Sequence, residues 1–135
     1  MKVEKLKKCV LAVILALGFI GLGACGSKPD KGTQEVIDKI VDYQTGVANT
    51  GFDDAKKNYK YTEDDFSFKI FYDRNQDVYL INAWIPYEDR KNDQNWKYCF
   101  TSKKELIKYD YDSDYMDHLK EGSFKLVYRS GKFDK

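Results

Sequence analysis

The stretch FSFKIFYDRNQDVYLINAWIPY, residues 66–87, decides the fold of this chain. Apolar side chains recur at every second position of its first part, as Phe66, Phe68, Ile70 and Tyr72. This period of two is typical of a β-strand with one buried face, and residues 73–77 predict a turn. Residues 78–87 are apolar on both faces apart from Asn82. That pattern predicts a central strand, either covered on both faces or covered once and offered to a partner.

The strand pattern continues beyond residue 87. Residues 88–95 (EDRKNDQN) predict a second turn, and Trp96, Tyr98 and Phe100 alternate with polar residues in a third strand. Residues 106–111 predict a fourth strand and residues 124–129 a last one. Between them, residues 112–122 predict a loop or a short helix that ends at Gly122. Because the connections are short, neighbouring strands are expected to be antiparallel.

One amphipathic helix precedes these strands. We expect it from about Thr33, whose side chain can cap the first turn, to Ala48. Its helically spaced positions are Val36, Ile37, Ile40, Val41, Gln44, Val47 and Ala48, with Gln44 as the one polar interruption. The sheet is the only surface available to bury this stripe. Residues 33–135 therefore predict one α+β domain, with an N-terminal helix packed on a curved, four- to five-stranded antiparallel sheet.

The first 24 residues predict a secretory signal peptide. Four lysines and one glutamate lie in residues 1–9, and an apolar or glycine run, VLAVILALGFIGL, follows at residues 10–22. Leu22-Gly23-Ala24-Cys25 then resembles the lipobox of bacterial lipoprotein precursors. The resemblance implies that the Cys25 sulfur carries a diacylglyceryl group, which palmitate labels, and that the chain is cut before Cys25. Residues 25–32 predict the lipidated cysteine and a short flexible tether at the outer face of the cell membrane.

Composition limits which classes of partner and which covalent links are expected for the mature chain. The whole sequence has 23 basic and 22 acidic side chains, and without the four lysines and one glutamate of the signal 19 and 21 remain. This balance disfavours a nucleic-acid partner, which usually meets a basic stripe. Cys9 leaves with the signal and Cys25 carries lipid, so Cys99 has no partner for a disulfide within the mature chain.

The tether, the helical segment TQEVIDKIVDYQTG and the strand opening FSFKIFYD resemble the small cystatin-like fold lipoproteins of Gram-positive bacteria. Some members of this largely uncharacterised family are carried on conjugative elements. There the implied role is exclusion of redundant transfer, through contact with the conjugation machinery. The fold name also implies protease inhibition, but the chain departs from the inhibitory QxVxG wedge. Its nearest stretch, QTGVANTG at residues 44–51, has the wrong spacing and lies at a helix end.

Three groups of residues are candidates for chemistry. Asp110, Asp112, Asp114 and Glu121 occupy acidic positions of an EF-hand loop, but Tyr115 stands where that loop needs glycine, so we expect a solvated acidic segment and no metal site. His118 is expected to be an exposed surface histidine. Cys99 is expected to be a quiet, partly buried thiol. With no phosphate loop, zinc spacing or catalytic triad order in the sequence, we expect no enzyme activity and no cofactor.

The aromatic content is the strongest indication of binding. Aromatic residues make up 16% of the chain, and Trp84 and Trp96 fall on neighbouring predicted strands. Tyr and Trp are frequent at interface hot spots, so these two tryptophans are the predicted partner-binding residues, although they could equally fill the core. The sequence thus predicts a membrane-anchored extracytoplasmic module that binds a surface or membrane protein. The alternatives are a regulator or inhibitor of a neighbouring membrane or surface enzyme, and a degenerate hydrolase that uses His118.

Overall fold

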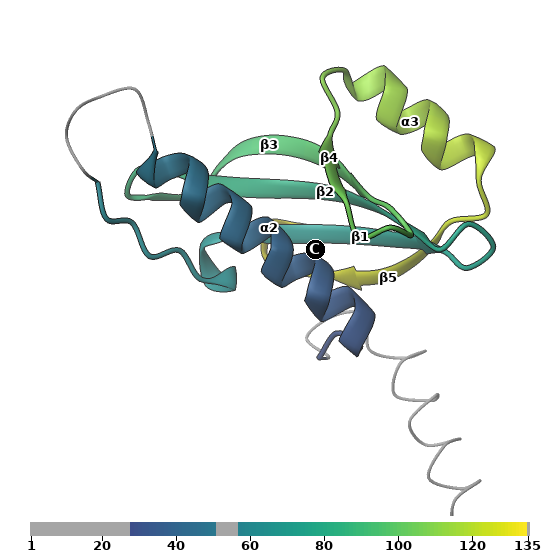
Figure 1. The fold of residues 1–135 in the computed structure, drawn as a ribbon, viewed down its shortest axis with the longest axis horizontal. Coiled ribbons are helices and arrows are strands. Elements are labelled where there is room, and N and C mark those ends of the chain that lie inside the picture. The colour runs from purple at the N-terminus through teal and green to yellow at the C-terminus, as the bar shows by residue number, and fades with distance from the viewer. Residues whose placement is uncertain (1–27, 51–56, 135) are drawn as a thin grey trace, which may run out of the picture.

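The computed structural model describes residues 28–50 and 57–134. Five strands form one antiparallel sheet in the order β4-β3-β2-β1-β5 (Figure 1). The strands are β1 (Ser67–Asp73), β2 (Val78–Tyr87), β3 (Arg90–Phe100), β4 (Leu106–Lys108) and β5 (Lys125–Arg129). The helices are α2 (Lys31–Asn49) and α3 (Asp112–Glu121), with short 3-10 turns η1 (Glu63–Asp65) and η2 (Gly131–Phe133). The predicted α+β class, with a helix packed on a curved antiparallel sheet, is confirmed.

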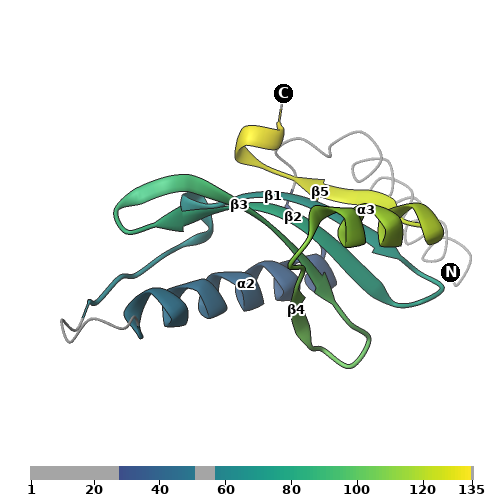
Figure 2. The same ribbon diagram turned by 90° about the horizontal axis from the view of Figure 1, so that it is seen from above.

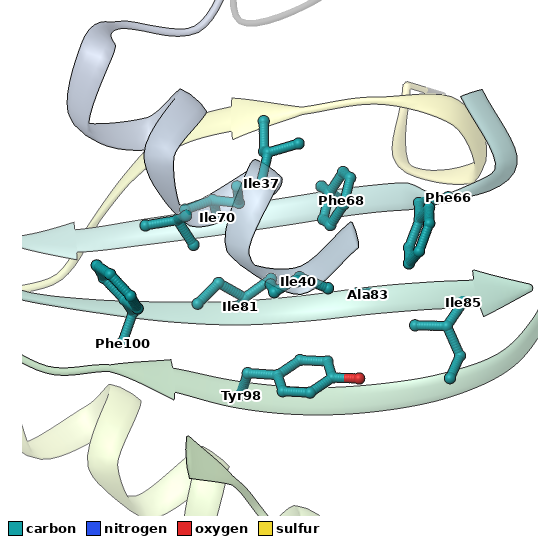
Figure 3. Close-up of a cluster of buried hydrophobic side chains, with 11 residues drawn as sticks. Ile37, Ile40, Phe66, Phe68, Ile70, Ile81, Ala83, Ile85, Tyr98 and Phe100 are labelled. Carbon is teal, nitrogen blue, oxygen red and sulfur yellow. The ribbon is translucent and has the colours of Figure 1, made fainter. Parts of the chain in front are cut away.

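Helix α2 covers one face of the sheet, called here the α2 face. Figure 2 shows the helix on one side of the strands and the C-terminal turn on the other. Val36, Ile37 and Ile40 of the helix have no exposed surface. Figure 3 shows Ile37 and Ile40 pointing into a layer of sheet side chains, namely Phe66, Phe68, Ile70, Ile81, Ala83, Ile85, Tyr98 and Phe100. Complete burial of each isoleucine stabilises the fold by about 1.5–3 kcal/mol.

The start of α2 differs from the prediction. Asp30, not Thr33, caps the helix, because its Oδ1 accepts a hydrogen bond from the Thr33 backbone N–H at 2.7 Å. The helix therefore begins at Lys31, two residues inside the segment predicted as tether. Thr33 is instead buried in the first turn. Gly32 explains how this turn approaches the sheet so closely, since a Cβ there would clash with the Tyr79 hydroxyl.

The connection between β2 and β3 is much shorter than predicted. Tyr87 pairs with Arg90, so the turn consists of Glu88 and Asp89 and most of the predicted turn is strand. The sequence predicts a turn at residues 90–95 because it does not show which strand would supply hydrogen-bonding partners to these polar residues. Pairing with the apolar end of β2 supplies those partners. Glu88 has a φ of 54°, a left-handed conformation that costs energy in a residue with a Cβ.

Two further elements complete the fold. The strand predicted at residues 106–111 is shorter, ending at Lys108, and residues 112–121 form helix α3, the second of the two predicted alternatives. Among the described residues, no helix is long and apolar enough to cross a bilayer. Residues 51–56, in the connection between α2 and η1, lie outside the described residues. Within the described part of this connection, residues 63–65 form η1.

A buried hydrogen bond joins α2 to the sheet. Gln44 Nε2 donates to the Tyr98 hydroxyl at 2.5 Å, and both residues are buried. Burial raises the pKa of Tyr98, an effect that the Gln44 hydrogen bond opposes. Gln44, the one polar residue in the apolar stripe of α2, therefore has a hydrogen-bonding partner on β3.

We expect Gln44→Leu to lower the free energy of unfolding by about 1–3 kcal/mol, because it leaves the Tyr98 hydroxyl buried without its donor. The double variant Gln44→Leu/Tyr98→Phe should recover much of that loss, since neither polar group then remains. Urea denaturation of the wild type, both single variants and the double variant measures the coupling. Additive effects of the two substitutions would contradict the proposed pairing.

The carboxylate of Asp73 holds the β1–β2 turn against the segment that leads into β5. It is 1% exposed. Its Oδ1 accepts from the backbone N–H groups of Asn75 at 2.9 Å and Gln76 at 3.2 Å. Its Oδ2 accepts from Gln76 Nε2 and from the Ser123 N–H, both at 2.8 Å. These hydrogen bonds, with that of Ser123 the largest contribution, lower the pKa of Asp73 below 3.8.

A carboxylate whose pKa is lowered in the folded state stabilises the fold above its unfolded-state pKa, and this contribution is lost as the pH falls through the folded-state pKa. We therefore expect Asp73→Asn to lower the Tm by several degrees at pH 7, because the amide turns a donor toward the Ser123 N–H. The Tm difference from wild type should shrink below about pH 4. Thermal denaturation against pH measures this. The same change at exposed Asp42 is the control, and an unchanged Tm difference across the pH range would contradict the expectation.

Candidate functional site

The second face of the sheet, called here the α3 face, is only partly covered. On this face Leu80 and Cys99 form a buried cluster with Tyr115 of α3. A ten-residue helix is about 15 Å long, whereas a ten-residue strand such as β2 spans about 33 Å. Helix α3 therefore cannot cover the full length of β2, and the remaining part of the α3 face carries polar side chains.

Four strands place a row of polar side chains across this remaining part. Register pairs Lys69 of β1 with Arg129 of β5 on one side and with Asn82 of β2 on the other, and Asn82 with Lys97 of β3. We call these four residues the cross-strand row. Directly paired residues share a face, and neighbouring strands are about 4.8 Å apart. The row thus brings three cationic side chains, all partly exposed, onto one line across the sheet.

Lys97 connects the row to helix α3. Its Nζ lies 3.1 Å from a carboxylate oxygen of Asp112, the first residue of α3. The Lys97 side chain is only 13% exposed, whereas that of Asp112 is 78% exposed. The Lys97 ammonium also donates to Asn95 Oδ1 at 2.5 Å, and Asn95 Nδ2 donates to Asn82 Oδ1 at 2.7 Å. An amide and lysine network therefore connects β2, β3 and the start of α3.

Trp84 lies in the next row, beside Ser67 and Asn95. The Lys132 Nζ of η2 sits 3.9 Å from the centre of the Trp84 ring, close enough for a cation–π interaction. The Lys132 backbone N–H donates to Ser67 Oγ at 2.9 Å, and its Nζ donates to the Asn92 carbonyl at 2.8 Å. The C-terminal turn is thereby fixed over this end of the α3 face.

Trp96 does not join Trp84. It pairs with Ala83, whose side chain points to the α2 face, and it packs partly buried against the main core. The ammonium of Lys108 lies over its ring. The two predicted partner-binding tryptophans therefore lie on opposite faces of the sheet and cannot form one contact surface. The spacing of the two tryptophans in the sequence does not show this separation. The length of the β2–β3 turn decides which residues pair, and therefore which residues share a face of the sheet.

Cys99, Tyr109 and His118 come together beneath α3. The Tyr109 hydroxyl and His118 Nδ1 are 2.6 Å apart, and the same hydroxyl is hydrogen-bonded to the Cys99 thiol. His118 is half-buried rather than exposed as predicted, because α3 turns it toward Tyr109 and Phe124. Burial raises the pKa values of both the Cys99 thiol and the Tyr109 hydroxyl. The neutral thiol is thus favoured, which suits a structural cluster better than a nucleophile.

The acidic segment is helical from Asp112 onward. Asp112 and Asp114 lie in the first turn of α3, where carboxylates are favourable to the helix dipole. Within residues 28–50 and 57–134, no group of three or more His, Cys, Asp or Glu side chains could hold a metal ion. Cys25, the predicted lipid-attachment residue, lies outside the described residues.

The cross-strand row was not predicted from the sequence. The only sign of the row in the sequence is that polar residues interrupt the strands at Lys69, Asn82 and Lys97. Their alignment depends on register, which the sequence does not give. Comparison of the chain with protein-family models, curated proteins and solved structures finds no match. The resemblance to cystatin-like lipoproteins therefore stays a prediction.

Proposed function

We propose that the protein is a lipid-anchored, extracytoplasmic binding module, and that the partly covered α3 face contacts another protein. The observation that carries the proposal is the cross-strand row with Trp84 beside it. Trp and Arg are enriched at protein interfaces, and this face carries one of each. The contact surface in this proposal, called the binding surface below, consists of Arg129, Lys69, Asn82, Lys97 and Trp84.

The anchor in this proposal is Cys25. The lipobox-like residues 22–25 support it, together with the apolar run before them. Each buried CH₂ group of an acyl chain contributes about 0.8 kcal/mol, so two long chains would hold the protein at the membrane. Because the chain enters the fold only a few residues later, at Asp30, the domain would work close to the membrane surface.

In this proposal the tether joins the domain away from Trp84. The first turn of α2, which follows the tether, packs at Tyr79 near the beginning of β2. Trp84 lies five residues farther along the same strand, a distance of about 17 Å. The anchored end and Trp84 are therefore at different ends of the sheet, which favours a partner that approaches from the side away from the tether.

The resemblance adds one specific form of this proposal. If the partner belongs to the conjugation machinery, the protein would act in exclusion of redundant transfer, which is the role that the resemblance implies for family members carried on conjugative elements. Identification of the partner decides between this form and a more general role in surface protein binding.

We expect cells fed labelled palmitate to incorporate it into the wild-type protein and not into Cys25→Ser. The variant should also leave the membrane fraction, because it lacks the acyl chains. Cys99→Ser is the matched control and should keep both the label and the membrane association. Labelling of Cys25→Ser, or unchanged fractionation of that variant, would contradict the lipid anchor.

We expect a photo-crosslinking amino acid at position 84 to capture a defined protein on intact cells. The same amino acid at Lys39, on the exposed side of α2, should not capture that protein. Gel analysis followed by mass spectrometry identifies the adduct. Identical adducts from positions 84 and 39, or none at position 84, would count against the α3 face as the contact surface.

A further inference from the structure

The end of the sheet beside the tether carries a row of side chains that spans all five strands. Register aligns one residue from each strand, and we call these five the tether row: Lys125, Tyr72, Tyr79, Phe100 and Leu106. Paired residues share a face, and Tyr79 and Phe100 pack in the core beneath α2, so the row lies on the α2 face. We infer that the tether row, with the cations around it, docks on the anionic lipid headgroups of the bilayer that holds Cys25.

This inference rests on the lipid anchor proposed above. It adds which surface of the domain faces the bilayer and which class of lipid that surface meets. It concerns the α2 face, so the protein contact proposed at Trp84 on the α3 face stays directed away from the membrane.

The first argument is the length of chain between the anchor and the fold. Cys25 and Lys31, the first residue of α2, are only six positions apart. An extended chain covers about 3.5 Å per residue, so at most about 20 Å separates the anchored residue from the helix. The helix reaches the tether row at once, because a Cβ on Gly32 would clash with the Tyr79 hydroxyl. The anchor therefore holds this row close to the headgroups.

The second argument is the chemistry of the row. Tyr72 and Tyr79 are partly exposed, and their ring centres are 4.4 Å apart. Tyrosine has an apolar ring and a polar hydroxyl, and it is enriched at the level of the lipid headgroups. Lys125 is exposed at one end of the row. A lysine can lay its carbon chain against apolar lipid groups while its ammonium reaches a phosphate.

The third argument is the charge around the row. Four exposed cationic side chains at this end have no ion-pair partner within residues 28–50 and 57–134, namely Lys31, Arg74, Lys103 and Lys125. They come from α2, the β1–β2 turn, the β3–β4 connection and β5. The ion pair of Lys104 with Glu35, at 3.3 Å, holds the β3–β4 connection beside the first turns of α2. Cations from four segments are thus gathered around the row.

The carboxylates at the same end are mostly engaged by the chain itself. Those that accept hydrogen bonds are Asp30, Asp73 and Asp77. Glu35 is in the ion pair with Lys104, and this leaves Glu105 as the acidic side chain here with no such contact among the described residues. Unpaired cations therefore outnumber unpaired carboxylates, and each cation near an anionic bilayer favours binding.

The outer side of α2 is a second surface within reach of the anchor, and it fits anionic lipid less well. Asp38 and Asp42 of α2, with Glu63 of η1, line a hollow of about 430 Å³ on this side. The residues that line it include no lysine or arginine. Anionic headgroups would repel these carboxylates, so the charge pattern turns the tether row toward the bilayer and the hollow away from it.

The test uses the chain from residue 25 onward, which contains every described residue. In a Cys99→Ser background, the Cys25 thiol is coupled to a maleimide-bearing lipid in vesicles, so attachment does not depend on acylation in cells. A photo-crosslinking amino acid replaces Asn75 in the β1–β2 turn, or Asp89 in the β2–β3 turn at the opposite end of the sheet. In vesicles that contain phosphatidylglycerol, we expect lipid adducts at position 75, detected by mass spectrometry, and few at position 89. Vesicles of phosphatidylcholine alone should give much less adduct at position 75.

Charge reversal locates the contact. One cation near an anionic bilayer changes the bound population about fivefold, so Lys103→Glu with Lys125→Glu should lower the adduct yield at position 75 by at least that factor. Lys39→Glu with Lys60→Glu makes the same charge change away from the tether row and should leave the yield nearly unchanged. Circular dichroism confirms that both variants are folded, and Lys103→Gln with Lys125→Gln is the milder variant if the first pair unfolds. The yield should also fall as salt rises to about 1 M, where the Debye length is about 3 Å.

Three results would overturn the inference: equal lipid adducts at positions 75 and 89, a yield that does not depend on phosphatidylglycerol, or an equal loss of yield in the control pair. Adducts between two protein chains at position 75, in place of lipid adducts, would also overturn it and would show that a second copy covers the row. Because the lipid is attached chemically, these outcomes are separate from palmitate labelling, which tests the anchor, and from crosslinking at position 84, which tests the protein contact.

Discussion

The fold depends on a strand that is buried on both faces. Leu80 and Ile81 are consecutive in β2 and neither has any exposed surface. Consecutive strand residues point to opposite faces, so both sides of the sheet must be covered at this point. Helix α2 covers Ile81 and helix α3 covers Leu80. The two helices, far apart in sequence, are thus both required by one pair of neighbouring side chains.

The unequal lengths of the two helices produce the binding surface. Helix α2 has 19 residues and runs along the sheet, whereas α3 has ten. The shorter helix buries the apolar row around Leu80 and leaves the next rows to polar side chains. There the network of Lys97, Asn95 and Asn82 satisfies groups that the helix does not cover. The proposed binding surface is therefore a direct consequence of how far α3 extends, rather than of a separate loop or domain.

The buried chemistry beneath α3 belongs to the stability of the domain. Tyr109 contacts both His118 and Cys99 in a region whose burial keeps the thiol and the phenol protonated. Asp73 fixes the β1–β2 turn at the same end of the sheet, because its carboxylate accepts a hydrogen bond from the backbone N–H of Ser123, between α3 and β5. Together they hold α3 in place, and the position of α3 sets the position of Asp112 at the row. A stabilising cluster and the proposed binding surface are therefore linked through one short helix.

The sequence by itself determined the α+β class, the single long helix and the alternating strands, because these follow from local periodicity of apolar residues. It also predicted that residues 78–87 form a central strand. It did not determine that polar residues 90–95 extend β3, since their strand hydrogen bonds come from β2. Nor could it separate Trp84 from Trp96 or align Lys69, Asn82 and Lys97. Only the tertiary structure decided these points, because the face that a side chain occupies depends on strand register, and a shift of one residue reverses it.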